Sequence, residues 1–136
     1  MLSEIPRAFA VPALADPEVP EVTVKEASAM ARAVIRLFDR WQLSDAEARE
    51  ILGGLSARTY ARWKKGSSGR IDCDLATRLS LLMGIHKSLH YLFSDPARGY
   101  AWVRHPNRAF DGRRPLDVML EGSIFSLARL RAYLDA

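Results

Sequence analysis

Residues 51–66 read Ile51-Leu-Gly-Gly-Leu-Ser-Ala-Arg-Thr-Tyr-Ala-Arg-Trp-Lys-Lys-Gly66, in which two adjacent glycines precede a serine and a run of helix-forming residues. Gly53 stands where a left-handed residue would end one helix. Ser56 can cap the next helix by accepting a hydrogen bond from its first turn. The stretch predicts two short helices joined by a glycine-containing turn, which is the pattern of a helix-turn-helix unit.

A helix from residue 57 to about 65 has two chemically different faces. At about 100° per residue, Tyr60 and Trp63 share one side, which predicts that they anchor the helix to a core. Five bases and no acid occur between residues 56 and 70. Guanidinium groups can bridge two acceptors on a guanine edge and lysines neutralise phosphates, so this helix suits DNA; a solvated helix face would show the same pattern. The expected DNA-binding residues are Arg58, Thr59, Arg62, Lys64 and Lys65.

Two capping signals precede this helix along the chain. Thr23 and Glu26 have the spacing of a capping box, and Ser44 and Glu47 repeat it. A long helix is expected after the first box and a helix of about two turns after the second. The first helix has apolar residues every three or four positions, as a stripe that faces a core requires: Ala27, Met30, Ala31, Val34, Leu37, Phe38 and Trp41.

A longer helix is expected from about residue 74 to 93, with Gly84 as a local weakness because glycine is a poor helix former. No part of the chain shows the alternating pattern of a strand, so the predicted fold class is all-α. The apolar residues expected on the core face of this helix are Leu75, Leu79, Leu82, Met83, Leu89, Leu92 and Phe93.

Composition limits the class of protein. The chain has 136 residues, of which 49% are hydrophobic and 26% charged, a balance typical of a folded globular domain. No apolar run approaches the twenty or so residues that a membrane span needs. One cysteine cannot form an internal disulfide, and no Cys/His set has the spacing of a zinc site. The expected location is therefore the reducing cytoplasm.

Charge is unevenly distributed along the chain. Residues 1–22 hold one arginine, four acids and four of the seven prolines, so we expect a flexible acidic tail and no secretion signal. The remainder carries a net charge of +7, because the whole chain is +4 and the tail is −3. A basic body is compatible with a nucleic-acid partner, although this charge is also common in proteins that only need to stay dissolved.

The last third of the sequence predicts three more short helices. Asp95 and Pro96 mark the start of a helix that ends near Val103. A loop follows, with a turn at Asp111-Gly112 and one large apolar side chain, Phe110, that is expected to plug the loop into the body. Pro115 begins another helix, and Ser123 can cap the last one. The residues expected to point inward from this last helix are Ile124, Leu127, Leu130 and Leu134.

Three fragments of this region resemble the toxin-binding domain of Xre/MbcA/ParS-type antitoxins by their order of tryptophan, Pro-Asn, glycine and Pro-Leu-Asp. The sequence from Ile51 to Gly66 is similar to the Xre-like helix-turn-helix of the same family. The resemblance covers about residues 25–136 and divides the chain into a tail (1–22), a helix-turn-helix domain (23–94) and a small C-terminal toxin-binding domain (95–136). The three fragments are Trp102-Val-Arg-His-Pro-Asn107, Ala109-Phe110-Asp-Gly112 and Arg114-Pro-Leu-Asp-Val118.

The resemblance implies an antitoxin of a type II toxin-antitoxin system. Its partner would be a RES-domain toxin that consumes NAD or transfers ADP-ribose, with the C-terminal domain covering the toxin's active site. The helix-turn-helix would bind the operon's own promoter as an autorepressor, and a homodimer within a larger complex is also implied. Such a protein is not an enzyme and needs no cofactor. The residues implied in toxin binding are Trp102, Asn107, Arg113, Arg114, Pro115, Leu116, Asp117, Arg129, Arg131 and Tyr133.

The residues of the last third give little support for separate toxin-binding and DNA-binding regions beyond the resemblance itself. In this chain Arg114 stands where many relatives have a capping Ser or Thr. Five arginines of the last third suggest a positive surface, which fully solvated side chains would also give. The main alternative is a plain helix-turn-helix repressor whose last third dimerises or senses a ligand; a protein-binding inhibitor with a vestigial helix-turn-helix is a second. The five arginines are Arg108, Arg113, Arg114, Arg129 and Arg131.

Signals for catalysis or metal binding are weak. His86 and His90 are four residues apart and can share a helix face, but no third ligand is evident. Asp72 and Asp74 are too close in sequence to share a helix face, and they would raise the pKa of the thiol of Cys73 between them. We therefore expect no catalytic residue and no metal site.

Overall fold

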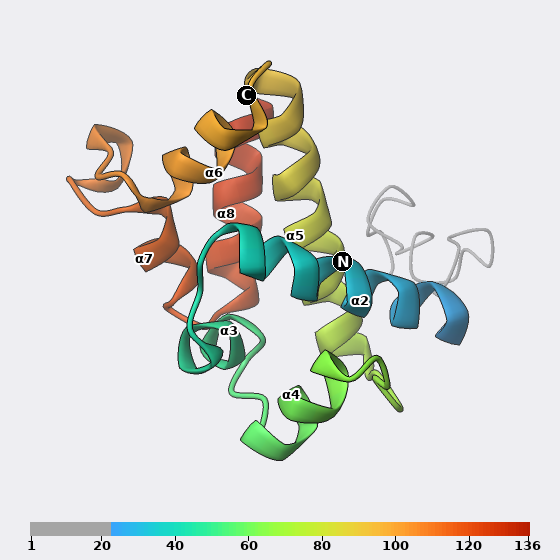
Figure 1. The fold of residues 1–136 in the computed structure, drawn as a ribbon. Coiled ribbons are helices and arrows are strands. Elements are labelled where there is room, and N and C mark those ends of the chain that lie inside the picture. The colour runs from blue at the N-terminus through green and yellow to red at the C-terminus, as the bar shows by residue number, and fades with distance from the viewer. Residues whose placement is uncertain (1–22) are drawn as a thin grey trace, which may run out of the picture.

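The computed structural model describes residues 23–136. Over this range every regular element is helical (Figure 1), which confirms the all-α prediction. The expected acidic tail, residues 1–22, lies outside the described residues. The elements in chain order are α2 (Val24–Arg40), α3 (Asp45–Ile51), α4 (Ala57–Lys64), α5 (Cys73–Leu92), α6 (Pro96–Arg104), the 3-10 turn η3 (Arg108–Phe110), α7 (Pro115–Met119) and α8 (Ile124–Asp135).

The predicted caps account for where the first helices begin and end. The Thr23 side chain accepts a hydrogen bond from the Glu26 amide at 3.1 Å. Ser44 and Glu47 form a complete capping box, with hydrogen bonds of 2.9 and 3.1 Å in the two directions. After α3, Gly53 has φ = 84°, a left-handed conformation that favours glycine. The chain therefore turns sharply and leads α3 into α4, as the helix-turn-helix pattern predicts.

Helix α5 is the central element of the molecule. It packs against α2 on one side and against α6 and α8 on the other, and Figure 1 shows α8 running alongside it. One continuous hydrophobic core joins the helix-turn-helix region to the last third of the chain. The largest completely buried side chains come from both regions: Val34, Phe38, Trp41, Ile51, Leu79, Leu82, Ile85, Val103, Leu116, Met119, Leu127 and Leu130.

Two arginines tie the same two regions together by hydrogen bonds. The guanidinium of Arg78 donates to the carbonyl of Ile51 at 3.2 Å and to that of Gly122 at 2.7 Å. That of Arg104 donates to the carbonyl of Trp41, at the end of α2, at 3.0 Å. Both arginines thus supply donors to carbonyls at helix ends, which lack partners within their own helices. The two regions form one packed body.

Three details of the predicted core are wrong. Leu92 is 55% exposed, because Leu89 and Phe93 take the positions that pack against Gly99 of α6. Ile85, which the prediction omitted, is completely buried. Ile124 is only partly buried at the start of α8.

Gly84 has a packing role that the sequence analysis missed. The guanidinium of Arg131 lies against it, and a Cβ on Gly84 would stand 2.5 Å from the Cζ atom of that arginine. The glycine therefore lets α8 place a long side chain directly on the backbone of α5, in addition to weakening the helix.

Candidate functional site

Helix α4 is held in one orientation by its cap and by two aromatic anchors. Ser56 accepts a hydrogen bond from the Thr59 amide at 3.1 Å and donates its hydroxyl proton to the Thr59 side chain at 2.9 Å. Tyr60 and Trp63 are buried, as predicted, and the Trp63 indole donates to the carbonyl of Ser68 at 3.1 Å. Because the buried side of α4 is fixed, its opposite side is fixed too.

The opposite side presents positive charge to solvent. Arg58, Arg62 and Lys65 are exposed, as is Arg70 in the connection to α5. No carboxylate of residues 23–136 forms an ion pair with any of the four. Gly69 leaves room for the Arg62 guanidinium, which would stand 3.2 Å from a Cβ at that position. We call these four residues, Arg58, Arg62, Lys65 and Arg70, the α4 basic face.

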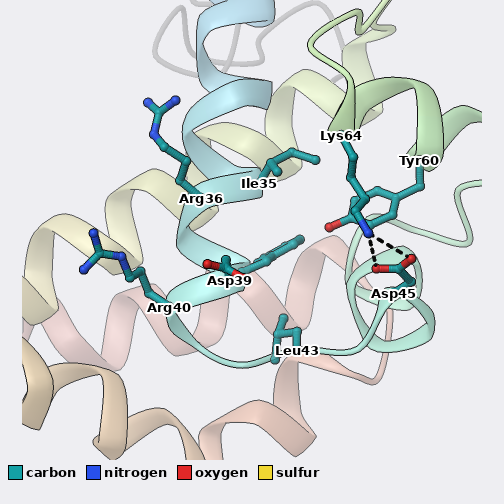
Figure 2. Close-up of a pocket in the computed structure, with 9 residues that line it drawn as sticks. Ile35, Arg36, Asp39, Arg40, Leu43, Asp45, Tyr60 and Lys64 are labelled. Atoms are coloured by element: carbon teal, nitrogen blue, oxygen red, sulfur yellow. Dashed lines mark hydrogen bonds and ion pairs between the residues drawn. The ribbon is translucent and has the colours of Figure 1, made fainter.

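Lys64 differs from the other predicted DNA-binding residues. Its ammonium nitrogen lies 3.0 and 3.2 Å from the two carboxylate oxygens of Asp45, at the start of α3. Figure 2 shows the side chain reaching across Tyr60, whose ring centroid is 6.0 Å from that nitrogen. The charge of Lys64 is therefore already compensated, while Thr59 is partly covered and shares its hydroxyl with Ser56.

A hollow of about 380 Å³ lies beside this ion pair, between α2, the start of α3 and α4. It combines the apolar side chains of Ile35 and Leu43 with the carboxylates of Asp39 and Asp45 (Figure 2). Burial, followed by these two carboxylates, raises the pKa of Tyr60 to about 12. The phenol therefore stays neutral around pH 7, and the charged side chains that line the hollow are the acids Asp39 and Asp45 and the bases Arg36, Arg40 and Lys64.

In the last third of the chain, three aromatic rings from different elements meet. Trp102 of α6 stacks on Tyr133 of α8, with centroids 6.4 Å apart and an interplanar angle of 11°. Phe110 of η3 meets Tyr133 edge-on at 5.1 Å and Trp102 edge-on at 6.4 Å. All three rings remain partly accessible to solvent, and Tyr133 is 45% exposed. We call Trp102, Phe110 and Tyr133 the aromatic cluster.

Asn107 organises the loop that carries Phe110. Its side-chain oxygen accepts a hydrogen bond from the Ala109 amide at 2.9 Å, and its own amide donates to the carbonyl of Arg113 at 3.0 Å. Asp111 and Gly112 both have positive φ, at 57° and 80°, so the predicted turn is present. Asn107 therefore acts on the shape of the loop, and it brings Phe110 to the other two rings.

The arginines near α7 are mostly paired with carboxylates, so the expected positive surface is smaller than the sequence suggests. Arg114 pairs with Asp117 at 2.7 Å, and its amide also donates to that carboxylate at 3.0 Å. Within residues 23–136 only Arg108 of the five has no ion pair. The other three pairs join Arg113 to Glu121 at 2.8 Å, Arg129 to Glu121 at 3.6 Å and Arg131 to Asp135 at 3.6 Å.

These pairs change the acidity of the two carboxyl groups. The hydrogen bond from the Arg114 side chain lowers the pKa of Asp117 below its ordinary value. The hydrogen bond from Ser126, followed by that from Arg113, lowers the pKa of Glu121. In place of a capping Ser or Thr, α7 thus begins with an arginine that is held by the carboxylate three residues later.

Some of the predicted toxin-binding residues lie at the surface, and others lie in the core. Pro115 and Leu116 are buried, so their side chains position α7 and are not accessible to a partner. Trp102 and Tyr133 come together at the surface, and Phe110 joins them. Phe110 was predicted only to plug its loop into the body, and Phe125, which is 83% exposed on α8, was not among the predicted residues. The signal for Phe125 was a large apolar residue two positions after the capping Ser123.

His86 and His90, the two histidines that could share a helix face, both lie on α5. The rings of His86 and His90 lie 6.2 Å apart, and burial followed by the charge of His90 lowers the pKa of His86. Residues 23–136 contain no group of three or more metal-ligating side chains. Within the same range, no helix is both long and apolar enough to cross a bilayer.

Comparison with known proteins finds two family domains in this chain. The model of the antitoxin Xre-like helix-turn-helix domain matches residues 21–84, and that of the antitoxin Xre/MbcA/ParS C-terminal toxin-binding domain matches residues 88–136. The uncharacterized protein y4oB of Sinorhizobium fredii (strain NBRC 101917 / NGR234) is 40% identical over 104 residues, which cover 76% of this chain and 80% of that protein. The chain therefore belongs to the Xre/MbcA/ParS family of antitoxins, with a DNA-binding helix-turn-helix followed by a toxin-binding domain.

Proposed function

We propose that this antitoxin neutralises a RES-domain toxin that consumes NAD or transfers ADP-ribose, and that it represses its own operon. The observation that carries this proposal is the separation of two surfaces on one packed body. Helix α4 lies near the beginning of α5, whereas α6 and the end of α8, which carry Trp102 and Tyr133, lie near its end (Figure 1). Twenty helical residues span about 30 Å, so the two surfaces can serve two partners at once.

The aromatic cluster is the proposed centre of toxin contact. Partly exposed Trp and Tyr side chains supply most of the binding free energy at many protein interfaces, because they bury a large area with little loss of conformational entropy. The ion pairs of Arg113 and Arg114 hold α7 and its loop in place, which preorganises the cluster for binding. By analogy with the family, the bound domain would cover the entrance to the toxin's active site.

Co-expression with a RES-domain toxin tests this proposal. We expect a stoichiometric complex and a restored cellular NAD level. Trp102→Ala or Tyr133→Ala should weaken the complex at least about tenfold, the usual size of a hot-spot effect. Tyr91→Ala is the matched control, since Tyr91 is an 89% exposed aromatic residue of α5 outside the aromatic cluster. A chain that binds its operator but no such toxin would instead support the plain repressor.

Promoter binding is tested by removing two arginines of the α4 basic face. We expect Arg58→Ala with Arg62→Ala to weaken binding to the operon's promoter at least about tenfold and to reduce its salt dependence, because two cations are lost. Arg98→Ala with Arg108→Ala is the control: it removes the same charge from two exposed positions in the last third of the chain. Equal effects of the two double variants would reject α4 as the DNA-binding element.

We further propose that the antitoxin acts as a homodimer in the cytoplasm. A helix-turn-helix dimer binds two half-sites one helical turn of DNA apart, about 34–36 Å. Footprinting should then reveal an inverted repeat with this spacing. Light scattering of the purified complex should give an even number of antitoxin chains, and a protected site without symmetry would contradict the dimer.

A further inference from the structure

The place where residues 1–22 join the described body is set by the first two turns of α2. The Ser68 hydroxyl donates to that of Ser28 at 3.0 Å, which holds the start of α2 against the connection between α4 and α5. Val24, the first residue of α2, is 80% exposed. The preceding segment is therefore attached beside the connection that carries Gly69 and Arg70.

The two sides of this junction have opposite charge. Arg58, Arg62, Lys65 and Arg70 are exposed, and none forms an ion pair with a carboxylate of residues 23–136. Residues 1–22 contain Glu4, Asp16, Glu18 and Glu21 against a single base, Arg7. Three of the four acids lie within seven residues of Thr23, where the described chain begins.

Chain length permits contact between these charges. Twenty-two residues reach at most about 75 Å when extended, whereas the eight residues of α4 span only about 12 Å. Because the segment is covalently attached to the body, its effective concentration near the α4 basic face is of the order of millimolar. Weak attraction between the acids and the basic face is therefore sufficient for substantial occupancy.

We propose that residues 1–22 dock onto the α4 basic face through their acids and compete there with DNA phosphates. The docking itself does not depend on the proposed promoter binding, but its consequence for DNA binding rests on that proposal. Non-specific binding to DNA depends almost entirely on phosphate contacts, whereas promoter binding also gains from base contacts. The segment therefore weakens non-specific binding by a larger factor than promoter binding, and it sharpens the discrimination between the two.

Docking can be measured in the full chain without DNA. A nitroxide is attached to the single thiol of the double variant Ala15→Cys with Cys73→Ser, and it should broaden the amide signals of residues 57–65 and 69–70 at low salt. The broadening should disappear in about 0.5 M salt, where the Debye length is only about 4 Å. It should also disappear when Glu4, Asp16, Glu18 and Glu21 are all changed to their amides.

A second variant of the same segment is the matched control. Ile5→Ser, Phe9→Ser and Leu14→Ser leave all five charges in place, so the broadening of α4 should persist. Broadening spread evenly over the surface, or broadening that follows the apolar residues and not the acids, overturns the proposal.

The consequence for DNA is measured with a non-specific duplex of about 20 base pairs. The chain with four neutralised acids should bind it about three- to tenfold more tightly than the unaltered chain at low salt, and the difference should shrink as salt rises. Equal affinities would overturn the competition. If no duplex or promoter binds at all while α4 is still broadened, the docking stands and the proposed promoter binding fails.

Discussion

Lys64 and Arg62 lie two residues apart on α4, yet their charges have different surroundings. Asp45 holds the lysine with contacts of 3.0 and 3.2 Å, whereas no described carboxylate pairs with the arginine. Pairs of this kind contribute little to stability at the surface. Their effect on the affinity for a binding partner is larger, because a lysine that is already paired with a carboxylate has to break that contact before it can bind the partner.

Replacing Asp45 by Asn should therefore strengthen DNA binding. The change releases Lys64 and removes a negative charge beside α4, so we expect affinity for DNA to rise several-fold at low salt, with a steeper salt dependence. Asp111→Asn, which removes the same charge from an exposed turn in the last third, should leave the affinity unchanged. Fluorescence anisotropy over a series of salt concentrations checks both, and equal slopes for the two variants would contradict the release of Lys64.

Gly84 is a second position where one residue has two opposing effects. Alanine in a helix interior is more favourable than glycine by about 1 kcal/mol, but here its methyl group would displace the Arg131 guanidinium. We expect Gly84→Ala to stabilise the Arg131→Ala variant by about 1 kcal/mol and to stabilise the unaltered chain by less. Urea denaturation of the four proteins measures this coupling, and an equal gain in both backgrounds would show that the arginine does not rest on the glycine.

At the scale of elements, α7 illustrates how a five-residue helix is maintained. It is too short to be stable by itself, so its start depends on Arg114 and Asp117 and its apolar face on the core. The carboxylates of Asp117 and Glu121 both have lowered pKa values in the fold. A lowered pKa means that the folded protein prefers the charged form more strongly than the unfolded chain does.

The stability of the protein should thus fall in acid. The contribution of these two carboxylates is complete above their ordinary pKa values of 3.8 and 4.5, and it is lost as the pH falls below them through the lower folded values. Asp117→Asn should be less stable at pH near 7 and should lose less on acidification. Urea midpoints measured between about pH 6 and pH 2.5 check this, and parallel curves for the two proteins would contradict the role of the pair.

At the scale of the whole molecule, the two family domains share one core and are expected to unfold together. The boundary between their sequence matches, residues 84–88, falls inside α5. Arg78, on the same helix, joins the end of α3 to the turn before α8. Removal of α7 and α8 would expose the apolar side of α5, so a chain cut before Pro115 should not keep the remaining helices folded.

Arg78→Ala should destabilise both regions by about 2–4 kcal/mol, because it leaves one buried and one partly buried carbonyl group without their donor. The loss should appear as one shifted transition, followed by helix content and by tryptophan fluorescence. Arg98→Ala, at an exposed position, should change the stability by less than about 0.5 kcal/mol. Two separate transitions in the unaltered chain would contradict the single core.

The sequence by itself determined the helices, the turn between α3 and α4, and the buried side of α4, because capping and periodicity act over three or four residues. The family likewise follows from short motifs. Only the tertiary structure decided which basic side chains have no ion pair within residues 23–136. Lys64 pairs with an acid 19 residues away, and Arg78 donates to a carbonyl 44 residues away. The same holds for the aromatic cluster, whose three rings come from α6, η3 and α8. Such contacts depend on how helices pack, and local spacing carries no information about that.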